Sequence, residues 1–249
     1  MGTFLKCCTS FILLNVTVPA ICFTQQHPDS VLLDSYAKTI IAPAPSDVAK
    51  LSPAITADTN TIIVARDTSF MQIDTKLKAA VIRLKIKTTE AEEFAMKNDF
   101  NTEYCFMVDM SIPSGKKRFF VYNMQKDTVE LASLVSHGSG SYKPDCKDHL
   151  TFSNAPNSFA TSLGRYKIGV SYYGTYGLSY KLCGLDSSNS KAFERAIVLH
   201  SDSYVPEKET YPRHIYESAG CPIVPPSILG ILGKYITKSS KPVLLWIYN

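Results

Sequence analysis

A histidine and a cysteine in the C-terminal part of the chain are the residue types of a base and a nucleophile. His200 ends the apolar run of residues 196–199, and Cys221 follows a glycine in the segment Ser-Ala-Gly-Cys-Pro at residues 218–222. An imidazole that takes the proton of a thiol generates the thiolate, which is the reactive form of cysteine. Two interpretations stay open, a catalytic pair and two unrelated structural residues, because spacing alone does not show that the side chains meet.

The neighbours of Cys221 restrict the backbone around the thiol. Gly220 leaves room for the approach of a substrate carbonyl, and Pro222 has a fixed φ and biases Cys221 toward an extended conformation. Pro222 has no N–H to donate. The backbone N–H groups of Gly220 and Cys221 are therefore the predicted donors to an oxyanion.

The first residues of the chain have the composition of an export signal. Lys6 is followed by an apolar stretch over residues 7–16 that is too short to span a bilayer, and then by small and turn-forming residues around Ala20. We expect a signal peptide over residues 1–24 and a mature protein in the periplasm or cell envelope, without a transmembrane segment after signal removal. A buried N-terminal helix is the alternative. Cys22 is a candidate lipid anchor, although Ile21 before it is larger than the residue usual at such sites.

Export changes the interpretation of the seven cysteines. Removal of Cys7, Cys8 and Cys22 would leave four cysteines: Cys105, Cys146, Cys183 and Cys221. Four are too few for a disulfide framework in a chain of this length. The fold must then depend on its hydrophobic core. Cys105 lies in an apolar run and is expected to be a buried thiol, whereas Cys146 and Cys183 could pair or stay free.

Charge and cysteine spacing argue against two further classes of function. The formal net charge is +4, and residues 116–118 form the one dense basic run, which falls short of the clustered positive surface of a nucleic-acid-binding protein. The chain has no CxxC pair and no tight cluster of histidine and cysteine. We therefore expect no nucleic-acid partner, no metal site and no cofactor.

The hydrophobic pattern divides the rest of the chain into two parts. Residues 25–100 form an N-terminal extension with a proline-rich linker at residues 42–46 and a helix over residues 74–97, for which Asp74 is the expected N-cap. Residues 81–87 could also form a strand. Residues 101–249 have the short apolar runs and turns of a mainly β domain. Strands are expected at residues 104–110, 118–123, 129–136, 164–171, 179–182, 196–200 and 242–248, with one helix near residues 227–236 capped by Ser227.

Six segments from about residue 101 onward resemble, in the same order, the YkuD-like L,D-transpeptidases, and more closely their murein L,D-transpeptidase catalytic-domain-like branch. These segments are residues 136–141, 152–154, 161–166, 180–185, 195–200 and 218–222. The resemblance implies a β-sandwich or barrel-like catalytic domain with a few helices. It also implies a cysteine acyltransferase that acts on peptidoglycan tetrapeptide stems.

In such an enzyme the thiol attacks the bond between the L-centre of diaminopimelate and the terminal D-alanine. The thioester then passes to an amine of a second stem, which gives a 3-3 cross-link, or to water, which gives L,D-carboxypeptidase activity. The resemblance assigns the nucleophile to Cys221, the base to His200 and an orienting backbone carbonyl to Ser201. It places His137, Ser218 and Tyr180 on the substrate side, although a structural hydrogen bond is an alternative role for His137.

The segment around Cys221 departs from the wider family. Ala219 stands where the family commonly has a second histidine. The family also has an arginine two positions after the cysteine, whereas Pro222 and Ile223 follow the cysteine here. Candidates to replace that arginine are Arg165, Lys181 and Arg213. Two other functions therefore stay open: a non-catalytic peptidoglycan-binding envelope protein and a cysteine peptidase that acts on proteins.

Overall fold

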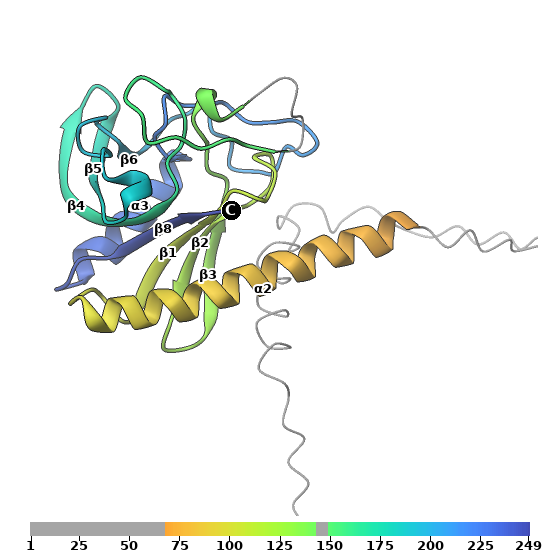
Figure 1. Ribbon diagram of the computed structural model, residues 1–249, viewed down its shortest axis with the longest axis horizontal. Helices are drawn as coiled ribbons and strands as arrows, with labels where there is room; N and C mark the ends of the chain where they lie inside the picture. Colours follow the sequence, from red (N-terminus) through yellow and green to blue (C-terminus); the bar gives the residue numbers. More distant parts are fainter. Residues whose placement is uncertain (1–67, 143–148) are drawn as a thin grey trace, which may run out of the picture.

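The computed structural model describes residues 68–142 and 149–249 (Figure 1). The expected signal peptide, Cys22, the proline-rich linker and Cys146 lie outside these residues. Cys105 and Cys183 are free thiols, and Cys105 is buried as expected. In the described part of the chain, no helix combines the length and apolar character that crossing a membrane requires.

One sheet of eight strands forms the body of the protein, in the order β3-β2-β1-β8-β4-β5-β6-β7. Its strands are β1 (Tyr104–Asp109), β2 (Phe119–Asn123), β3 (Thr128–Ser133), β4 (Gly164–Gly174), β5 (Gly177–Gly184), β6 (Val198–Ser201), β7 (Ile223–Val224) and β8 (Leu244–Tyr248). Strand β8 joins the two halves, because it pairs in parallel with β1 and antiparallel with β4. The expected mainly β fold with an N-terminal helix is confirmed.

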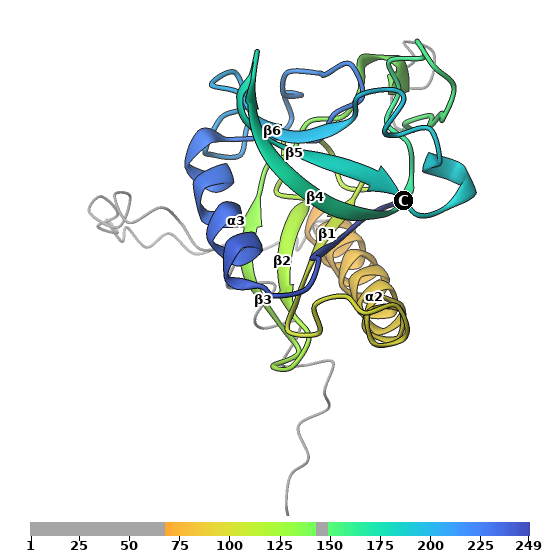
Figure 2. The ribbon, with the colours of Figure 1, turned by 90° about the vertical axis from the view of Figure 1, so that its left-hand side faces the viewer.

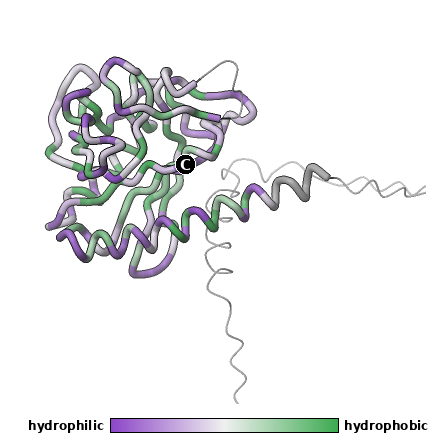
Figure 3. The backbone as a smooth tube through the Cα atoms, in the orientation of Figure 1, coloured by the Kyte–Doolittle hydropathy of each residue, from purple (hydrophilic) through white to green (hydrophobic). Residues whose placement is uncertain are grey.

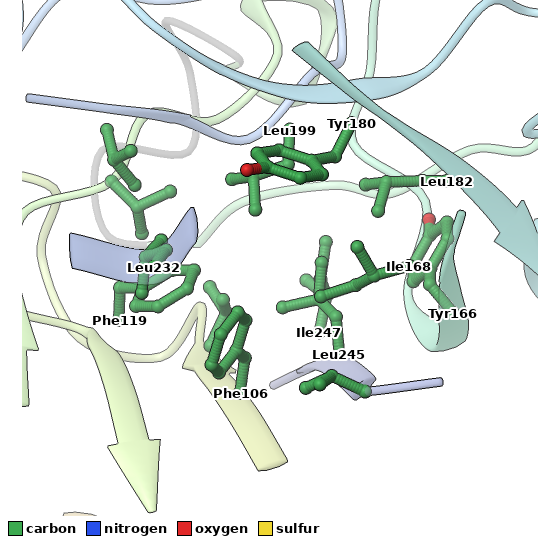
Figure 4. Close-up of a cluster of buried hydrophobic side chains, with 14 of the residues drawn as sticks. Phe106, Phe119, Tyr166, Ile168, Tyr180, Leu182, Leu199, Leu232, Leu245 and Ile247 are labelled. Carbon is green, nitrogen blue, oxygen red and sulfur yellow. The ribbon is translucent and has the colours of Figure 1, made fainter. Parts of the chain in front are cut away.

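The two halves of the sheet share one hydrophobic core. Side chains of β1 and β2, such as Phe106 and Phe119, belong to the same buried cluster as Leu182 and Leu199 of β5 and β6. Figure 4 shows these side chains facing one another, with Leu232 of helix α3 (Pro226–Lys238) among them. The sheet therefore curves around a common interior, and α3 covers part of it.

Helix α2 (Thr68–Lys97) covers the other face of β1 and β8. Its buried residues follow helical spacing and pack against side chains such as Met107 and Leu244: Ala80, Val81, Leu84, Ala91 and Ala95. Figure 2 shows α2 and α3 on opposite sides of β1–β3, and Figure 3 shows hydrophilic and hydrophobic stretches alternating along α2. Packing of the N-terminal helix on the main domain is thus confirmed, and residues 81–87 are helical. The expected domain boundary near residue 100 stays a prediction.

The final strand is covered on both faces, as its continuous apolar sequence predicts. Leu245 and Ile247 point into the core shared with α3, whereas Leu244 and Tyr248 belong to the cluster under α2. Alternation along a strand sends neighbouring side chains to opposite faces, so a strand apolar throughout needs two covering layers.

Both predicted helix caps are wrong. Helix α2 begins at Thr68, so Asp74 lies inside the helix. Helix α3 begins at Pro226 with Pro225 before it, and no side chain caps its first turn. The Ser227 hydroxyl instead donates to the carboxylate of Glu207, at 2.7 Å from Oε1. A proline at the first helical position lacks the N–H that a cap would satisfy.

Candidate active site

The turn before Cys221 leads directly into β7, which pairs in parallel with β6. In this register His200 lies opposite Ile223. Cys221 precedes Ile223 by two positions, and both side chains pack with the same small cluster around Leu134. Alternation in extended backbone places such residues on one face. The fold thus brings His200 and Cys221 onto neighbouring segments at one edge of the sheet.

The Cys221 thiol lies half-buried in this edge. Its Sγ donates to the carbonyl oxygen of Ala196 at a donor–acceptor distance of 3.9 Å. Burial raises the pKa of the thiol, while a hydrogen bond from the Val198 backbone and the positive charge of Arg195 oppose that shift. The group is therefore a protonated thiol at neutral pH.

The His200 ring is held in the tautomer that a general base requires. Its Nδ1 lies 3.2 Å from the carbonyl oxygen of Ser201. A carbonyl can only accept, so Nδ1 carries the proton and Nε2 keeps a lone pair. The ring is 2% exposed and stacks on Tyr176, with ring centroids 4.5 Å apart.

Burial also lowers the pKa of His200, against the opposing effects of the Ser201 carbonyl and Asp202. The resting pair is then a neutral thiol and a neutral imidazole rather than an ion pair. Such a pair transfers its proton as the nucleophile attacks, which is general-base catalysis.

The two predicted oxyanion donors differ in their surroundings. The N–H of Gly220 donates to the Ser218 hydroxyl at 3.0 Å, so it would have to leave that acceptor to serve an oxyanion. The N–H of Cys221 stays a predicted donor. Gly220 has φ +116°, a conformation that L-residues rarely adopt. Ser218 itself is buried, and its observed contact supports the turn rather than a substrate.

His137 lies beside the same turn through its backbone. Ser218 donates its N–H to the His137 carbonyl at 2.8 Å, and Ser139 donates to the Ser218 carbonyl at 2.7 Å. The His137 ring is buried, and Nδ1 lies 2.9 Å from Nη2 of Arg118. A guanidinium only donates, so Nδ1 accepts and Nε2 carries the proton.

The buried Nε2–H of His137 has no hydrogen-bond partner within the described ranges, and Oε1 of Glu217 is 3.9 Å away. Burial lowers the pKa of His137 to about 3, and the charges of Arg118 and His214 act in the same direction. The ring is therefore a fixed neutral donor. This position agrees with a substrate-side role and also with support of the turn by Arg118.

Tyr180 is not brought to this site. In the pairing of β5 with β6, His200 lies opposite Ser179 and Tyr180 lies opposite Leu199. Tyr180 therefore faces the core, and Figure 4 shows its ring among the buried side chains of that cluster. A Cβ built at Gly233 of α3 would lie 2.8 Å from its hydroxyl. Tyr180 is therefore a core side chain, and its substrate-side assignment stays a prediction.

Two of the three cations proposed to replace the family arginine are engaged with other side chains. Arg165 pairs with Asp186, and its guanidinium carbon lies 4.3 Å from the ring centroid of Phe94 on α2. The Lys181 ammonium lies between the rings of Tyr172 and Phe193, at 5.8 and 5.6 Å from their centroids. Arg213 is exposed on the loop before the turn.

Three residues that the sequence did not single out contact the site. Tyr176 stacks on His200 from the tip of the β4–β5 hairpin. The Ser136 hydroxyl lies 3.3 Å from the Cys221 carbonyl oxygen and accepts from the N–H of Ile223 at 3.1 Å. Arg195 lies against Gly220, where Nη2 would be 3.1 Å from a Cβ added to the glycine. Ser136 and Arg195 had a signal, since each opens one of the segments that resemble the family.

No group of three or more His, Cys, Asp or Glu side chains in residues 68–142 and 149–249 is arranged to hold a metal ion. The chemistry available at this edge is that of a thiol, an imidazole and backbone donors. This set is sufficient for acyl transfer through a thioester.

Comparison with known proteins adds a family to this geometry. The sequence matches the family described as L,D-transpeptidase catalytic domain over residues 74–248. No functionally curated protein matches the chain by sequence. The match covers well over half of the chain and includes every residue of the candidate site.

Several solved structures are similar to the chain. An L,D-transpeptidase from Enterococcus faecium is 14% identical with a TM-score of 0.35, and the similarity covers 59% of this chain and 50% of that protein. One from Xylanimonas cellulosilytica is 12% identical with a TM-score of 0.33, over 63% and 68% of the two chains. One from Mycobacterium smegmatis is 13% identical with a TM-score of 0.33, over 59% of each. This chain therefore spans about half the length of the Enterococcus faecium protein. From the sequence match over residues 74–248, the chain belongs to the YkuD-like L,D-transpeptidase catalytic-domain family.

Proposed function

We propose that this protein is a cell-wall L,D-transpeptidase, a cysteine acyltransferase that acts on peptidoglycan tetrapeptide stems. One observation carries the proposal. The pairing of β6 with β7 supports it, because it brings the segment that carries Cys221 beside the strand of His200, whose Nδ1–H is held by the Ser201 carbonyl. The tautomer leaves Nε2 as the proton acceptor that a protonated thiol needs.

The reaction proceeds in two acyl transfers. The Cys221 sulfur attacks the carbonyl carbon that joins the L-centre of diaminopimelate to D-alanine, and Nε2 of His200 takes the thiol proton. The C–N bond then breaks, His200 returns the proton to the leaving amine, and D-alanine departs from a thioester on Cys221. The N–H of Cys221 is the proposed donor to the oxyanion. An amine of a second stem or water then releases the acyl group.

The cellular setting belongs to the same proposal. We infer export through the signal over residues 1–24 to the periplasm or cell envelope, where stem peptides are the partner. Signal cleavage before Cys22 would instead leave this cysteine at the new N-terminus, as the candidate lipid anchor. The acyl acceptor decides between 3-3 cross-linking and carboxypeptidase activity, and both begin with the same thioester.

Incubation with a purified disaccharide tetrapeptide, followed by mass analysis of the products, tests the proposal. We expect release of D-alanine together with a tripeptide or a 3-3 cross-linked dimer, and no product with Cys221→Ala. Retention of the muropeptide without turnover would favour the non-catalytic binding protein. Cleavage of a protein substrate that depends on Cys221, with muropeptides untouched, would favour the cysteine peptidase.

A further inference from the structure

The guanidinium of Arg195 is held at the site by uncharged acceptors. Nη1 donates to the Ser153 carbonyl at 2.9 Å and to the Ser162 hydroxyl at 3.0 Å, and Nη2 donates to the Ala160 carbonyl at 2.6 Å. No carboxylate forms an ion pair with Arg195 among the side chains that the structure describes. Its positive charge is therefore not neutralised by the protein there.

This charge lies next to the nucleophile. A Cβ built on Gly220 would lie 3.1 Å from Nη2 of Arg195 and 3.0 Å from the Ala160 carbonyl oxygen that Arg195 holds. Gly220 immediately precedes Cys221, and the charge of Arg195 acts on the thiol to lower its pKa. Arginine has five N–H donors, so about two remain after these contacts. The side chain is only partly buried, which leaves it accessible to a ligand.

A partly buried arginine with unused donors is suited to a carboxylate. Its planar fork matches the two oxygens of a carboxylate, which an ammonium group cannot match in the same way. The other cations considered for this role are engaged elsewhere: Arg165 with Asp186, and Lys181 with aromatic rings. Arg195 is the cation that the fold places against the nucleophile turn.

We propose that Arg195 is a substrate-binding residue that recognises a carboxylate adjacent to the scissile bond. On the proposed function, on which this identification of the substrate rests, that group is the carboxylate of the terminal D-alanine. The loop of residues 153–162 then has a defined role, because three of its oxygens orient the guanidinium toward the turn.

Two alkylating reagents test the proposal without assuming any turnover. Iodoacetate carries a carboxylate and iodoacetamide is its neutral analogue, and both react with the same thiolate. The ratio of their rates at Cys221, read by peptide mass spectrometry, therefore cancels any change in thiol ionisation. We expect Arg195→Met to lower the iodoacetate-to-iodoacetamide ratio by about fivefold, equal to ~1 kcal/mol at 1.4 kcal/mol per tenfold.

Matched variants separate charge from fold. Lys97→Met removes the same charge from an exposed position on α2 and should keep the wild-type ratio, and Arg195→Lys keeps the charge without the planar fork and should retain part of the preference. An unchanged ratio in a folded Arg195→Met protein would overturn the proposal, as would equal losses in the Lys and Met variants. If Arg195→Met does not fold, the wild-type protein alone provides the test. The iodoacetate-to-iodoacetamide ratio of its Cys221 should exceed that of glutathione and should fall with added salt. A ratio equal to that of glutathione would refute the role.

A second measurement links this residue to the substrate. Tetrapeptide stems with a free terminal carboxylate should have a lower KM than the same stems with a terminal amide, and Arg195→Met should remove the difference. Turnover of stems without any effect of Arg195 on the ratio or on KM would leave the transpeptidase and reject the carboxylate site. If the iodoacetate-to-iodoacetamide ratio depends on the charge of Arg195 but stems are not turned over, the carboxylate site is supported and the transpeptidase is rejected.

Discussion

Replacement of Gly220 by alanine should destabilise the whole domain as well as impair the chemistry at Cys221. Gly220 has φ +116°, where an L-residue is strained, and strain of this kind costs about 1–3 kcal/mol. The new methyl group would also lie 3.0 Å from the Ala160 carbonyl oxygen and 3.2 Å from Cδ1 of Ile197. The carbonyl cannot retreat freely, because Arg195 donates to it.

The two effects together predict a loss of about 2–4 kcal/mol in the free energy of unfolding. Gly230 provides the matched control, since it lies exposed in α3 and a Cβ there meets nothing within 4 Å. Gly230→Ala should raise the free energy of unfolding by about 0.5–1 kcal/mol, because alanine is the better helix former. The same substitution thus has opposite signs at two positions.

Urea denaturation of the three proteins measures these differences, with unfolding followed by the fluorescence of Trp246. The alkylation rate of Cys221 under native conditions gives the effect on the site. A Gly220→Ala protein as stable as the wild type would show that the turn adopts another backbone conformation. The assignment of Arg195 and Ala160 to the immediate surroundings of Cys221 would then be wrong.

Three further predictions concern protonation and support of the site. Because burial raises the pKa of Cys221, the midpoint of its alkylation rate against pH should lie above that of a free cysteine, and a midpoint at or below the free value would contradict a protonated resting thiol. Ser201→Ala should change turnover by less than about twofold, since only the Ser201 carbonyl holds His200, and a large loss would require a role for the hydroxyl. Arg118→Met should lower the free energy of unfolding by about 2–3 kcal/mol, because the buried guanidinium donates to two backbone carbonyls and to His137. Thermal and urea unfolding measure that loss, and unchanged stability would show that these contacts are not needed.

Most strands could be predicted, because a short apolar run between two turns indicates a buried strand. The final strand is the clearest case. Its continuous apolar sequence predicts that both of its faces are covered, and in the structure both faces are covered. Strand β7 escaped prediction because it has two residues and exists through its pairing with β6. The helix starts were also missed. Asp74 and Ser227 are residue types that commonly cap helices, but neither stands at the position before the first helical residue.

The site was predictable where its geometry is local. The Ser201 carbonyl lies 3.2 Å from Nδ1 of His200, because an imidazole reaches the backbone of the following residue, and its role in catalysis stays a prediction. The bond from Gly220 to the Ser218 hydroxyl is also local, and a serine two residues before the donor could have indicated it. The burial of Tyr180 depends on the register between β5 and β6, which no single strand sequence specifies.

Arg195 illustrates what sequence reasoning cannot reach here. Its three acceptors lie between 33 and 42 positions earlier in the chain, on a loop without periodic pattern. The sequence offers Arg165, Lys181 and Arg213 as candidates and gives no reason to prefer Arg195. Only the fold distinguishes a cation beside Gly220 from cations that lie on aromatic rings.

The central claim is that Cys221 becomes acylated with the help of His200. Intact-protein mass spectrometry after incubation with a carbapenem tests this most directly. We predict a single covalent adduct on the wild type, located at Cys221, that forms far more slowly with His200→Ala and not at all with Cys221→Ala. The absence of an adduct on the folded wild-type protein, or an adduct that persists in Cys221→Ala, would contradict the account.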